Sequence, residues 1–233
     1  MQVVSLLSGG QDSTTCLFWS IQKFGATEVV ALTIDYGQRH NSEIGAAARI
    51  AEIAGVEWKL LSFPALQQIG DSPLVSSSGS IVGTHRGRSD LPASFVPGRN
   101  YLFLGLAAAL AYKVGADSVV GGMCQTDYSG YPDCREVAIR HIEQAISTSM
   151  DFPLKIYTPL MYLTKADSVR MAQGLADCMD ALAYSQTCYE GKYPPCEVCP
   201  ACRLRAKGFM EAGIPDPLIV RSRMDLRKGG WHV

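Results

Sequence analysis

Residues 3–21, Val-Val-Ser-Leu-Leu-Ser-Gly-Gly-Gln-Asp-Ser-Thr-Thr-Cys-Leu-Phe-Trp-Ser-Ile, decide how this chain is organised. The apolar run 3–7 predicts a buried strand, and the residues from Cys16 onward predict a helix. Two glycines and several hydroxyl side chains lie between them. A strand, a glycine-rich turn and a helix N-terminus form an anion cradle, because free backbone N–H groups and the positive end of the helix dipole converge there. We therefore expect a phosphate group to bind at this turn.

The predicted cradle matches neither of the two common phosphate-binding loops. It lacks the Gly-Lys-Ser/Thr ending of a Walker loop and the three-glycine pattern of dinucleotide-binding folds. Its glycines let the backbone approach a ligand closely, and the hydroxyls of Ser8, Ser13 and Thr14 can add donors. Asp12 is unusual here because its charge repels phosphate. It caps the helix, holds Mg²⁺ against the phosphates, or does both.

Strand and helix patterns alternate along most of the chain. Further strands are expected at residues 28–35, 56–61, 117–122 and 155–160, and helices at 42–54, 100–114, 133–149 and 165–175. This alternation predicts an α/β fold with a doubly wound, parallel, five-stranded sheet, which is Rossmann-like. Residues 70–98 contain no clear element and are either a functional loop, such as a lid, or a mobile linker. We expect an α/β domain over residues 1–180 and a small C-terminal region over 181–233 that carries a cysteine cluster and, beyond it, one short helix and a basic tail.

Ligands of open parallel sheets bind beyond the carboxyl ends of the strands, where residues 8–13, 35–40, 121–133 and 159–165 are expected to lie. Arg99 precedes Asn100, the expected N-cap of a helix, and an arginine there costs about 0.3–1 kcal/mol unless an anion is nearby. Lys165 is placed to neutralise a phosphate charge, although both cations have a solvated alternative. Tyr128 and Tyr131 can stack on a planar ring and Asp127 or Asp133 can accept its hydrogen bonds, unless this segment is an ordinary turn.

Four of the eight cysteines form a cluster, Cys188-x7-Cys196-x2-Cys199-x2-Cys202. Four thiolates suit tetrahedral Zn²⁺ in a closed structural site, and Cys-x2-Cys-x2-Cys also suits an iron–sulfur cluster. Either metal would use all four ligands and leave no open position for Lewis-acid chemistry. We expect the metal to fold a C-terminal region that is too thin to bury a core of its own.

The composition excludes several classes of function. The 233 residues are 47% hydrophobic with a net charge of −1, and the pI is near 6.4, which argues against a broad nucleic-acid-binding or membrane-binding surface. No apolar run reaches the roughly 18 residues of a membrane span. The first residues lack a signal-peptide pattern, so the cytoplasm is the expected location. None of the four histidines pairs with a serine or cysteine at a spacing typical of a hydrolase triad.

The segment Ser8-Gly9-Gly10-Gln11-Asp12-Ser13 resembles the SGGxDS signature of the PP-loop ATP pyrophosphatases, which have the adenine nucleotide α-hydrolase-like fold. Within that superfamily the chain is similar to the 7-cyano-7-deazaguanine synthase family of queuosine biosynthesis. The resemblance rests on segments 8–16, 35–40, 95–100, 126–134 and 159–165 and on the four clustered cysteines. It implies a ligase that converts 7-carboxy-7-deazaguanine and ammonia to a nitrile through an amide. One ATP would activate a carboxylate oxygen by adenylation, and a second would activate the amide oxygen.

The resemblance also implies ligands, to which we assign site residues as a hypothesis. ATP with Mg²⁺ is expected to contact Leu7, Ser8, Gly9, Gly10, Gln11, Asp12, Ser13, Thr14, Thr15, Cys16, Leu17 and Asp35. The expected catalytic residues are Asp12, Arg99 and Lys165, and the expected deazaguanine contacts are Arg99, Asn100, Thr126, Asp127, Tyr131 and Asp133. One structural Zn²⁺ per subunit is expected on Cys188, Cys196, Cys199 and Cys202. The resemblance further suggests a homodimer without nucleic-acid or membrane partners; the source of the ammonia is not readable.

Two other functions remain open from the sequence. A PP-loop tRNA thiolase also adenylates its substrate, but it passes on sulfur from a persulfide or an iron–sulfur cluster. Cys124 or Cys134 would then carry the sulfur, and iron with sulfide would replace zinc. A regulatory module of the same fold would bind ATP without turning it over.

Overall fold

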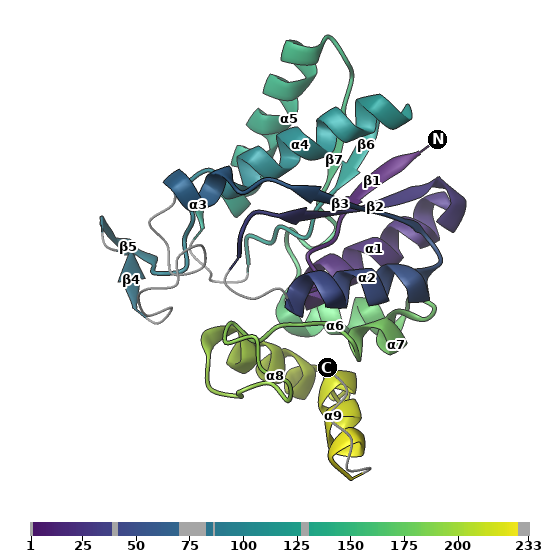
Figure 1. Ribbon diagram of the computed structural model, residues 1–233, viewed down its shortest axis with the longest axis vertical. Coiled ribbons are helices and arrows are strands. Elements are labelled where there is room, and N and C mark those ends of the chain that lie inside the picture. Colours follow the sequence, from purple (N-terminus) through teal and green to yellow (C-terminus); the bar gives the residue numbers. More distant parts are fainter. Residues whose placement is uncertain (1, 39–41, 70–82, 86, 127–130, 228–233) are drawn as a thin grey trace.

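The computed structural model describes residues 2–38, 42–69, 83–85, 87–126 and 131–227 (Figure 1). Its central sheet has five parallel strands in the order β3-β2-β1-β6-β7. The strands are β1 (Val3–Leu6), β2 (Val29–Asp35), β3 (Glu57–Ser62), β6 (Ser118–Val120) and β7 (Lys155–Tyr157). The parallel five-stranded sheet predicted from the sequence is confirmed.

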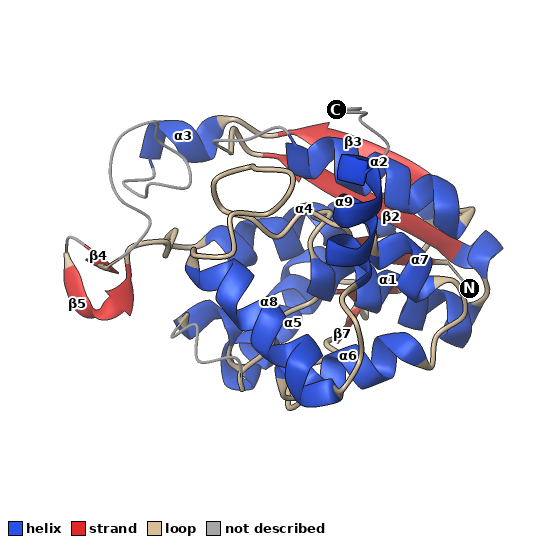
Figure 2. Cartoon of the chain, turned by 90° about the horizontal axis from the view of Figure 1, so that it is seen from below, coloured by secondary structure: helices blue, strands red, loops and turns tan. Residues whose placement is uncertain are grey.

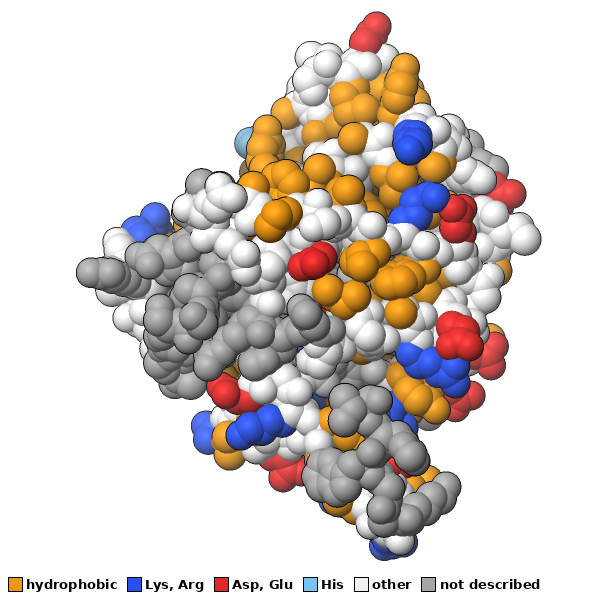
Figure 3. Space-filling view, in the orientation of Figure 1, with side chains coloured by type: hydrophobic (Ala, Val, Ile, Leu, Met, Phe, Trp, Pro, Cys, Tyr) orange, Lys and Arg blue, Asp and Glu red, His pale blue; other side chains and the backbone are white. Residues whose placement is uncertain are grey.

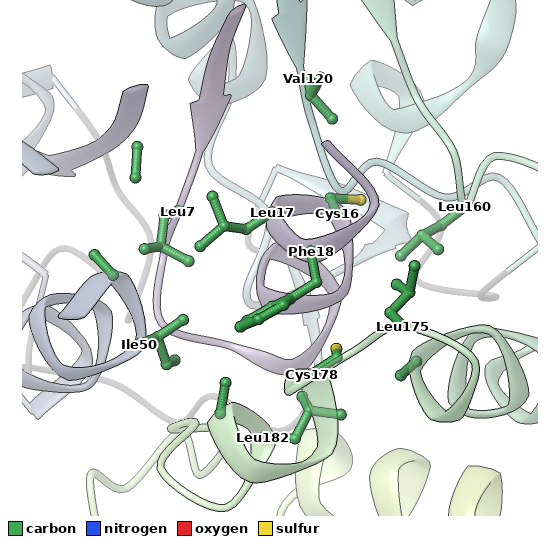
Figure 4. Packing of buried hydrophobic residues seen from close by; sticks show 14 of the residues in the cluster. Leu7, Cys16, Leu17, Phe18, Ile50, Val120, Leu160, Leu175, Cys178 and Leu182 are labelled. Atoms are coloured by element: carbon green, nitrogen blue, oxygen red, sulfur yellow. The ribbon is translucent and has the colours of Figure 1, made fainter. Parts of the chain in front are cut away.

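Helices cover both faces of the sheet (Figure 1). One face packs against α1 (Gln11–Phe24), α2 (Ser42–Ala54), α6 (Lys165–Gln173) and α7 (Cys178–Leu182), and the other against α4 (Arg99–Val114) and α5 (Glu136–Met150). Successive side chains of β1 point to opposite faces, so Val3 and Val4, both fully buried, belong to different clusters. Figure 4 shows the first cluster, in which Leu7, Leu17, Ile50 and Leu182 come together from β1's end, α1, α2 and α7.

Strand β1 lies at the point where the winding of the sheet reverses. It pairs with β2 on one side and with β6 on the other. The segments that follow β1 and β6 therefore leave the sheet toward opposite faces and diverge at the carboxyl edge. Such a switch point is the usual place for a ligand in an open α/β sheet.

Helix α1 begins at Gln11, five residues before the predicted start at Cys16. The residue at its N-cap is Gly10, so Asp12 is not the cap. The hydroxyl-rich stretch resembles a loop in sequence, but its hydroxyls bond within the helix. Thr14 Oγ1 donates to the Gly10 carbonyl at 2.8 Å and Thr15 Oγ1 donates to the Gln11 carbonyl at 3.1 Å. These bonds to the preceding turn satisfy the side chains in a helical conformation.

Residues 70–98 were predicted to contain no regular element, and this was wrong for their second half. A two-stranded hairpin, β4 (Thr84–His85) with β5 (Arg88–Pro92), lies apart from the main sheet, as Figures 1 and 2 both show. A short helix, α3 (Ala65–Ile69), precedes the segment. Residues 70–82 lie outside the described part of the chain. The two short strands escaped prediction because three of the five residues of β5 are exposed and polar, with no apolar alternation.

The C-terminal region has two helices where one was predicted. Helix α8 (Pro200–Ala212) and helix α9 (Pro217–Arg227) follow the cysteine-rich segment. Phe209 of α8 joins the core cluster of the first sheet face. The remaining short elements are the 3₁₀ turns η1 (Ala26–Glu28) and η2 (Pro132–Cys134). The boundary near residue 180 stays a prediction.

The surface carries both signs of charge. On the face drawn in Figure 3, the acidic and basic side chains of the described residues are interspersed. None of the helices in the described parts of the chain is long and apolar enough to cross a membrane.

A substitution at Gly9 tests how closely the cradle packs against α2. Its φ is +87°, and a Cβ there would overlap the Glu43 carbonyl oxygen and lie 3.0 Å from the Ala47 nitrogen of α2. We expect Gly9→Ala to lower the free energy of unfolding by roughly 2–5 kcal/mol, from backbone strain and overpacking. Urea denaturation measures it.

Gly45→Ala is the matched control, because Gly45 lies in α2 with open space around its Cα. We expect this variant to gain about 0.5–1 kcal/mol from helix propensity. A Gly9→Ala protein as stable as the native one would contradict the close approach of the cradle to α2.

Candidate functional site

A cavity of about 360 Å³ opens at the carboxyl edge of β1 and β6. It brings together the three residues predicted to be catalytic, Asp12, Arg99 and Lys165. The described charged side chains that line it are Asp12, Glu43, Arg99, Lys165 and Arg205. Tyr36 and Met123 also line it, from the segments 35–40 and 121–133 that were expected at this edge. Sequence reasoning missed other lining residues, because they come from segments for which no site was predicted: Glu43, Phe103, Gln186, Thr187, Tyr189 and Arg205.

The cradle is held in shape by its own hydroxyl groups. Ser8 N–H donates to Ser13 Oγ at 3.1 Å, and Ser13 Oγ donates to the Gly10 carbonyl at 3.1 Å. Gly10 N–H donates to Ser8 Oγ at 3.3 Å. No side chain caps the start of α1, so the helix presents its first-turn N–H groups and its dipole to the cavity. Ser8, Gly10, Gln11, Asp12 and Ser13 all line it.

Asp12 and Lys165 form an ion pair across the cavity wall. Lys165 Nζ donates to Asp12 Oδ1 at 2.9 Å and to Oδ2 at 2.8 Å. Lys165 is the first residue of α6, whose start is fixed by a capping box between Thr164 and Asp167. The ammonium group neutralises the carboxylate, so the negative charge of Asp12 beside the start of α1 would not by itself exclude an anion from the cradle. In this structure Lys165 thus offsets the charge of Asp12.

The start of α4 differs from its prediction. Gly98, with φ of 74°, occupies the N-cap position, and Asn100 is the second helical residue instead of the cap. A distant carboxylate takes over the capping role, because Asn100 N–H donates to Asp133 Oδ2 at 3.2 Å. The Asn100 side chain is buried and donates from Nδ2 to Cys134 Sγ at 3.3 Å.

Arg99 lies in an aromatic part of the cavity. Its guanidinium carbon is 5.8 Å from the centre of the Tyr131 ring, a cation–π distance. Burial disfavours its charge, but Tyr36, Tyr131 and Asp133 face it and keep the pKa of Arg99 above its ordinary value. Tyr131 shares a 2.6 Å hydrogen bond between its hydroxyl and Ser94 Oγ. Tyr131 also stacks on Phe95 with ring centres 6.0 Å apart.

The other residues expected to bind the substrate or ATP occupy varied positions. Thr126 Oγ1 donates to the Met161 carbonyl at 3.4 Å, and Asp127 lies outside the described residues. Asp35 Oδ1 accepts the Gly37 N–H at 3.0 Å, so this carboxylate shapes the turn after β2. The side chains of five further residues are buried in α1 or beside β1: Leu7, Thr14, Thr15, Cys16 and Leu17.

Glu43 is the least expected of the charged residues. It lies in the first turn of α2 and is half-buried against the cavity. Among the residues that the structure describes, none forms a hydrogen bond or an ion pair with its carboxylate. Loss of hydration raises the pKa of Glu43 to about 7, and Arg99 opposes this shift only in part. The group is therefore able to exchange a proton near neutral pH.

The four clustered cysteines come together as the spacing predicted. The sulfur atoms of Cys188, Cys196, Cys199 and Cys202 all lie within 4.8 Å of one another. Zinc–sulfur bonds of about 2.3 Å in a tetrahedron place the sulfurs roughly 4 Å apart, and Cys196 Sγ lies 4.0 Å from Cys202 Sγ. Cys199 N–H donates to Cys196 Sγ at 3.4 Å. Burial opposes ionisation of Cys196, but the N–H groups of Cys199 and Val198 lower its pKa. The cluster can therefore hold a metal.

Arg205 connects this cluster to the cradle. Its buried guanidinium donates to both carboxylate oxygens of Asp216 at 2.6 and 2.8 Å. It also donates to Ser185 Oγ at 2.7 Å and Thr187 Oγ1 at 2.8 Å. Between those residues, Gln186 N–H donates to the Gly9 carbonyl at 2.8 Å. A helix that begins at the cysteines thus positions the backbone of the cradle.

Known proteins resemble this chain over most of its length. The family model described as queuosine biosynthesis protein QueC matches residues 2–213. A 7-cyano-7-deazaguanine synthase of Chromobacterium violaceum is 50% identical over 220 residues, which cover 94% of each chain. A protein of the same name from Laribacter hongkongensis is 49% identical over 216 residues, 93% of each chain.

A more distant likeness concerns a solved structure. The crystal structure of a 4-thiouridine synthetase–RNA complex with bound ATP gives a TM-score of 0.52. Its sequence is 16% identical, and the match covers 95% of this chain and 52% of that one. Likeness at this level shows a shared fold alone.

The pKa of Glu43 makes stability depend on pH. Because this pKa rises from its ordinary 4.5 to about 7 on folding, the folded state binds more protons, and stability falls as pH rises between those values. Replacing Glu43 with glutamine removes the titrating carboxyl group and with it this pH dependence. We expect Glu43→Gln to be more stable than the native protein by roughly 1–3 kcal/mol at pH 8. The difference should disappear near pH 4.5 in denaturation curves taken without ligands.

Glu52→Gln is the control, because Glu52 lies exposed on the same helix. It should show no such trend. Stability curves of Glu43→Gln and the native protein that stay parallel from pH 4.5 to 8 would contradict the raised pKa.

Proposed function

This chain belongs to the QueC family of queuosine biosynthesis proteins, and we propose that it is a 7-cyano-7-deazaguanine synthase. The reaction joins the nitrogen of ammonia to the carboxyl carbon of 7-carboxy-7-deazaguanine at the expense of ATP, first as an amide and then as a nitrile. One observation supports this most directly. A single cavity is lined by the cradle, the Asp12–Lys165 pair and Arg99. The chain is also 50% and 49% identical in sequence to relatives of that name.

Adenylation is the first step. A carboxylate oxygen of the substrate attacks the α-phosphorus of ATP, and the bond to pyrophosphate breaks. The negative charge that develops on the leaving group would be held by the first-turn N–H groups of α1 and by Ser8 and Ser13, which line the cavity. Donors fixed by the fold need no reorganisation when that charge appears. This is how the cradle residues would lower the barrier.

The Asp12–Lys165 pair would divide when ATP enters. Phosphate oxygens compete with Asp12 for the Lys165 ammonium, and the released carboxylate then suits a divalent cation. Mg²⁺ typically takes one or two carboxylates together with phosphate oxygens, and it would neutralise charge on the phosphates. Asp12, at the mouth of the cradle, is the residue that would hold it.

The deazaguanine would lie on the aromatic side of the cavity. Arg99 is available to pair with the substrate carboxylate, and the Tyr131 ring beside it offers a stacking surface. Asn100 lines the same wall. Thr126, Asp127 and Asp133 stay proposed contacts to the base.

The thiolase alternative finds less support. A sulfur carrier acts as a thiolate, but burial raises the pKa of Cys134 to about 12. The shared fold with 4-thiouridine synthetase does not favour either chemistry. A purely regulatory module would bind ATP through similar charged groups, so formation of a product is what distinguishes it from the synthase.

We infer that the cysteine cluster binds one structural Zn²⁺ per chain through Cys188, Cys196, Cys199 and Cys202. The four sulfurs would close the site, so the metal would supply folding energy instead of chemistry. A cytoplasmic homodimer is the assembly that we propose, from family resemblance.

The decisive assay combines the protein with ATP, Mg²⁺, ammonia and 7-carboxy-7-deazaguanine and follows product masses. We expect the amide to appear and then the nitrile. Asp12→Ala should reduce turnover by at least about 100-fold, because the carboxylate proposed to hold Mg²⁺ against the phosphates is lost, while the metal content of the cysteine cluster stays near one per chain. Folded, metal-loaded native protein that forms neither product would rule out the synthase.

The metal site has its own prediction. Cys199→Ala should lose the bound metal and melt at a markedly lower temperature, because metal binding and folding of this region are coupled. Metal content by mass spectrometry and thermal melting measure both effects. Cys178→Ala, a buried cysteine outside the cluster, should keep one metal per chain. Unchanged melting of Cys199→Ala would remove the structural role.

A further inference from the structure

The proposed reaction has a chemical requirement that adenylation does not meet. When ammonia displaces AMP, a C–N bond forms, the C–O bond to AMP breaks, and the nitrogen gives up one proton. After the amide oxygen attacks a second ATP, the C–O bond to AMP breaks again, and the same nitrogen gives up its two remaining protons as the C≡N bond forms. Three protons therefore leave one nitrogen. A base in contact with that nitrogen would accelerate each transfer.

The cavity offers few candidates for this base. Asp12 is engaged by Lys165 through both oxygens, and it lies where charge on phosphate must be neutralised. Asp133 is not among the described residues that line the cavity, and it accepts the Asn100 N–H at the start of α4. Cys134 is a poor acceptor for protons from nitrogen because its thiol is buried beside a carboxylate. Of the described carboxylates that line the cavity, only Glu43 has no partner in the part of the chain that the structure describes.

We propose that Glu43 is the general base that removes protons from the attacking nitrogen, both in amide formation and in the loss of AMP that yields the nitrile. This rests on the proposed synthase function. The role is chemical instead of structural, because no described group depends on the Glu43 carboxylate for a hydrogen bond or an ion pair.

The position of Glu43 fits the role. The start of α2 packs directly on the cradle, since a Cβ on Gly9 would overlap the Glu43 carbonyl oxygen. Across the cavity, Arg99 is close enough to influence the ionisation of Glu43. Glu43 therefore lies between the place for the phosphates and the place for the substrate carboxylate. The carboxyl carbon that becomes an acyl adenylate must lie between the same two places.

The surroundings of Glu43 also suit a base that works near neutral pH. The groups that face it are Arg99 from α4 and Tyr36 from the segment after β2, with the Asp12–Lys165 pair farther along the wall. Loss of hydration outweighs the attraction of Arg99, so the pKa of Glu43 is about 7. A base of this strength accepts a proton readily and returns it to solvent between steps.

The test separates adenylation from nitrogen chemistry. Exchange of labelled pyrophosphate into ATP, measured with 7-carboxy-7-deazaguanine and without ammonia, reports the first step alone. We expect Glu43→Gln to keep this exchange within about 3-fold, while amide formation from ammonia falls about 10²–10⁴-fold. Nitrile formation from added amide and ATP should fall by a similar factor. Glu43→Asp should recover part of both rates, and Glu52→Gln should behave as the native protein.

The pH profile gives a second readout. In the native protein the rate of amide formation should drop below about pH 7, as Glu43 becomes protonated, and this limb should be missing from the residual activity of Glu43→Gln. Three results would overturn the proposal. Loss of pyrophosphate exchange together with amide formation would place Glu43 at ATP or its cation, and a raised KM for 7-carboxy-7-deazaguanine at unchanged kcat would make Glu43 a contact to the deazaguanine ring. Amide formation by Glu43→Gln within about 3-fold of the native rate would show that no base at this position is needed. Failure of the synthase function itself is distinct, because the native protein would then make no amide.

Discussion

The arrangement of the site depends on residue 9 being a glycine, which has no side chain. The residue lies between α2, whose Glu43 carbonyl and Ala47 nitrogen would meet a Cβ, and residue Gln186, whose N–H donates to the Gly9 carbonyl at 2.8 Å. Its left-handed φ of +87° turns the chain from β1 into the start of α1. One peptide unit thus sets the distance between the phosphate cradle, the first turn of α2 and the C-terminal wall. Any larger residue would separate these three elements.

Once the elements are in place, the charges of the cavity sort into paired and unpaired groups. Lys165 neutralises Asp12, and Arg205 is neutralised by Asp216. Pairing lowers the cost of holding these groups away from water and fixes their geometry. Arg99 and Glu43 remain, facing one another across the cavity without an ion pair among the described residues. Groups left in this state are the ones whose charge a ligand can still change, which is why perturbed pKa values concentrate at sites of chemistry.

The sequence predicted the features that local pattern controls. The five strands, the cradle and the cysteine cluster each depend on periodicity or on close spacing, and all three were found. The start of α1 was harder to predict, because the hydroxyls of Thr14 and Thr15 donate to carbonyls of the preceding turn and these residues therefore belong to the helix. The start of α4 could not be read from Asn100, because its N–H is satisfied by Asp133, which is 33 residues away. Glu43 and Gln186 belong to the site only through packing around Gly9, and no motif of their own marks them.

The same packing would give a metal bound at the four cysteines an influence on the cavity. Cys199 occupies the N-cap position of α8, and Cys202 and Arg205 follow at intervals of three residues, so they lie along one side of the helix. Cysteines fully coordinated to a metal would fix where α8 begins, and therefore where the Arg205 guanidinium meets Ser185 and Thr187. Those two residues flank Gln186, which holds Gly9. A metal with no open coordination position would thus still influence the shape of the cradle, because the links between them are a turn of helix, short hydrogen bonds and adjacent residues of the chain.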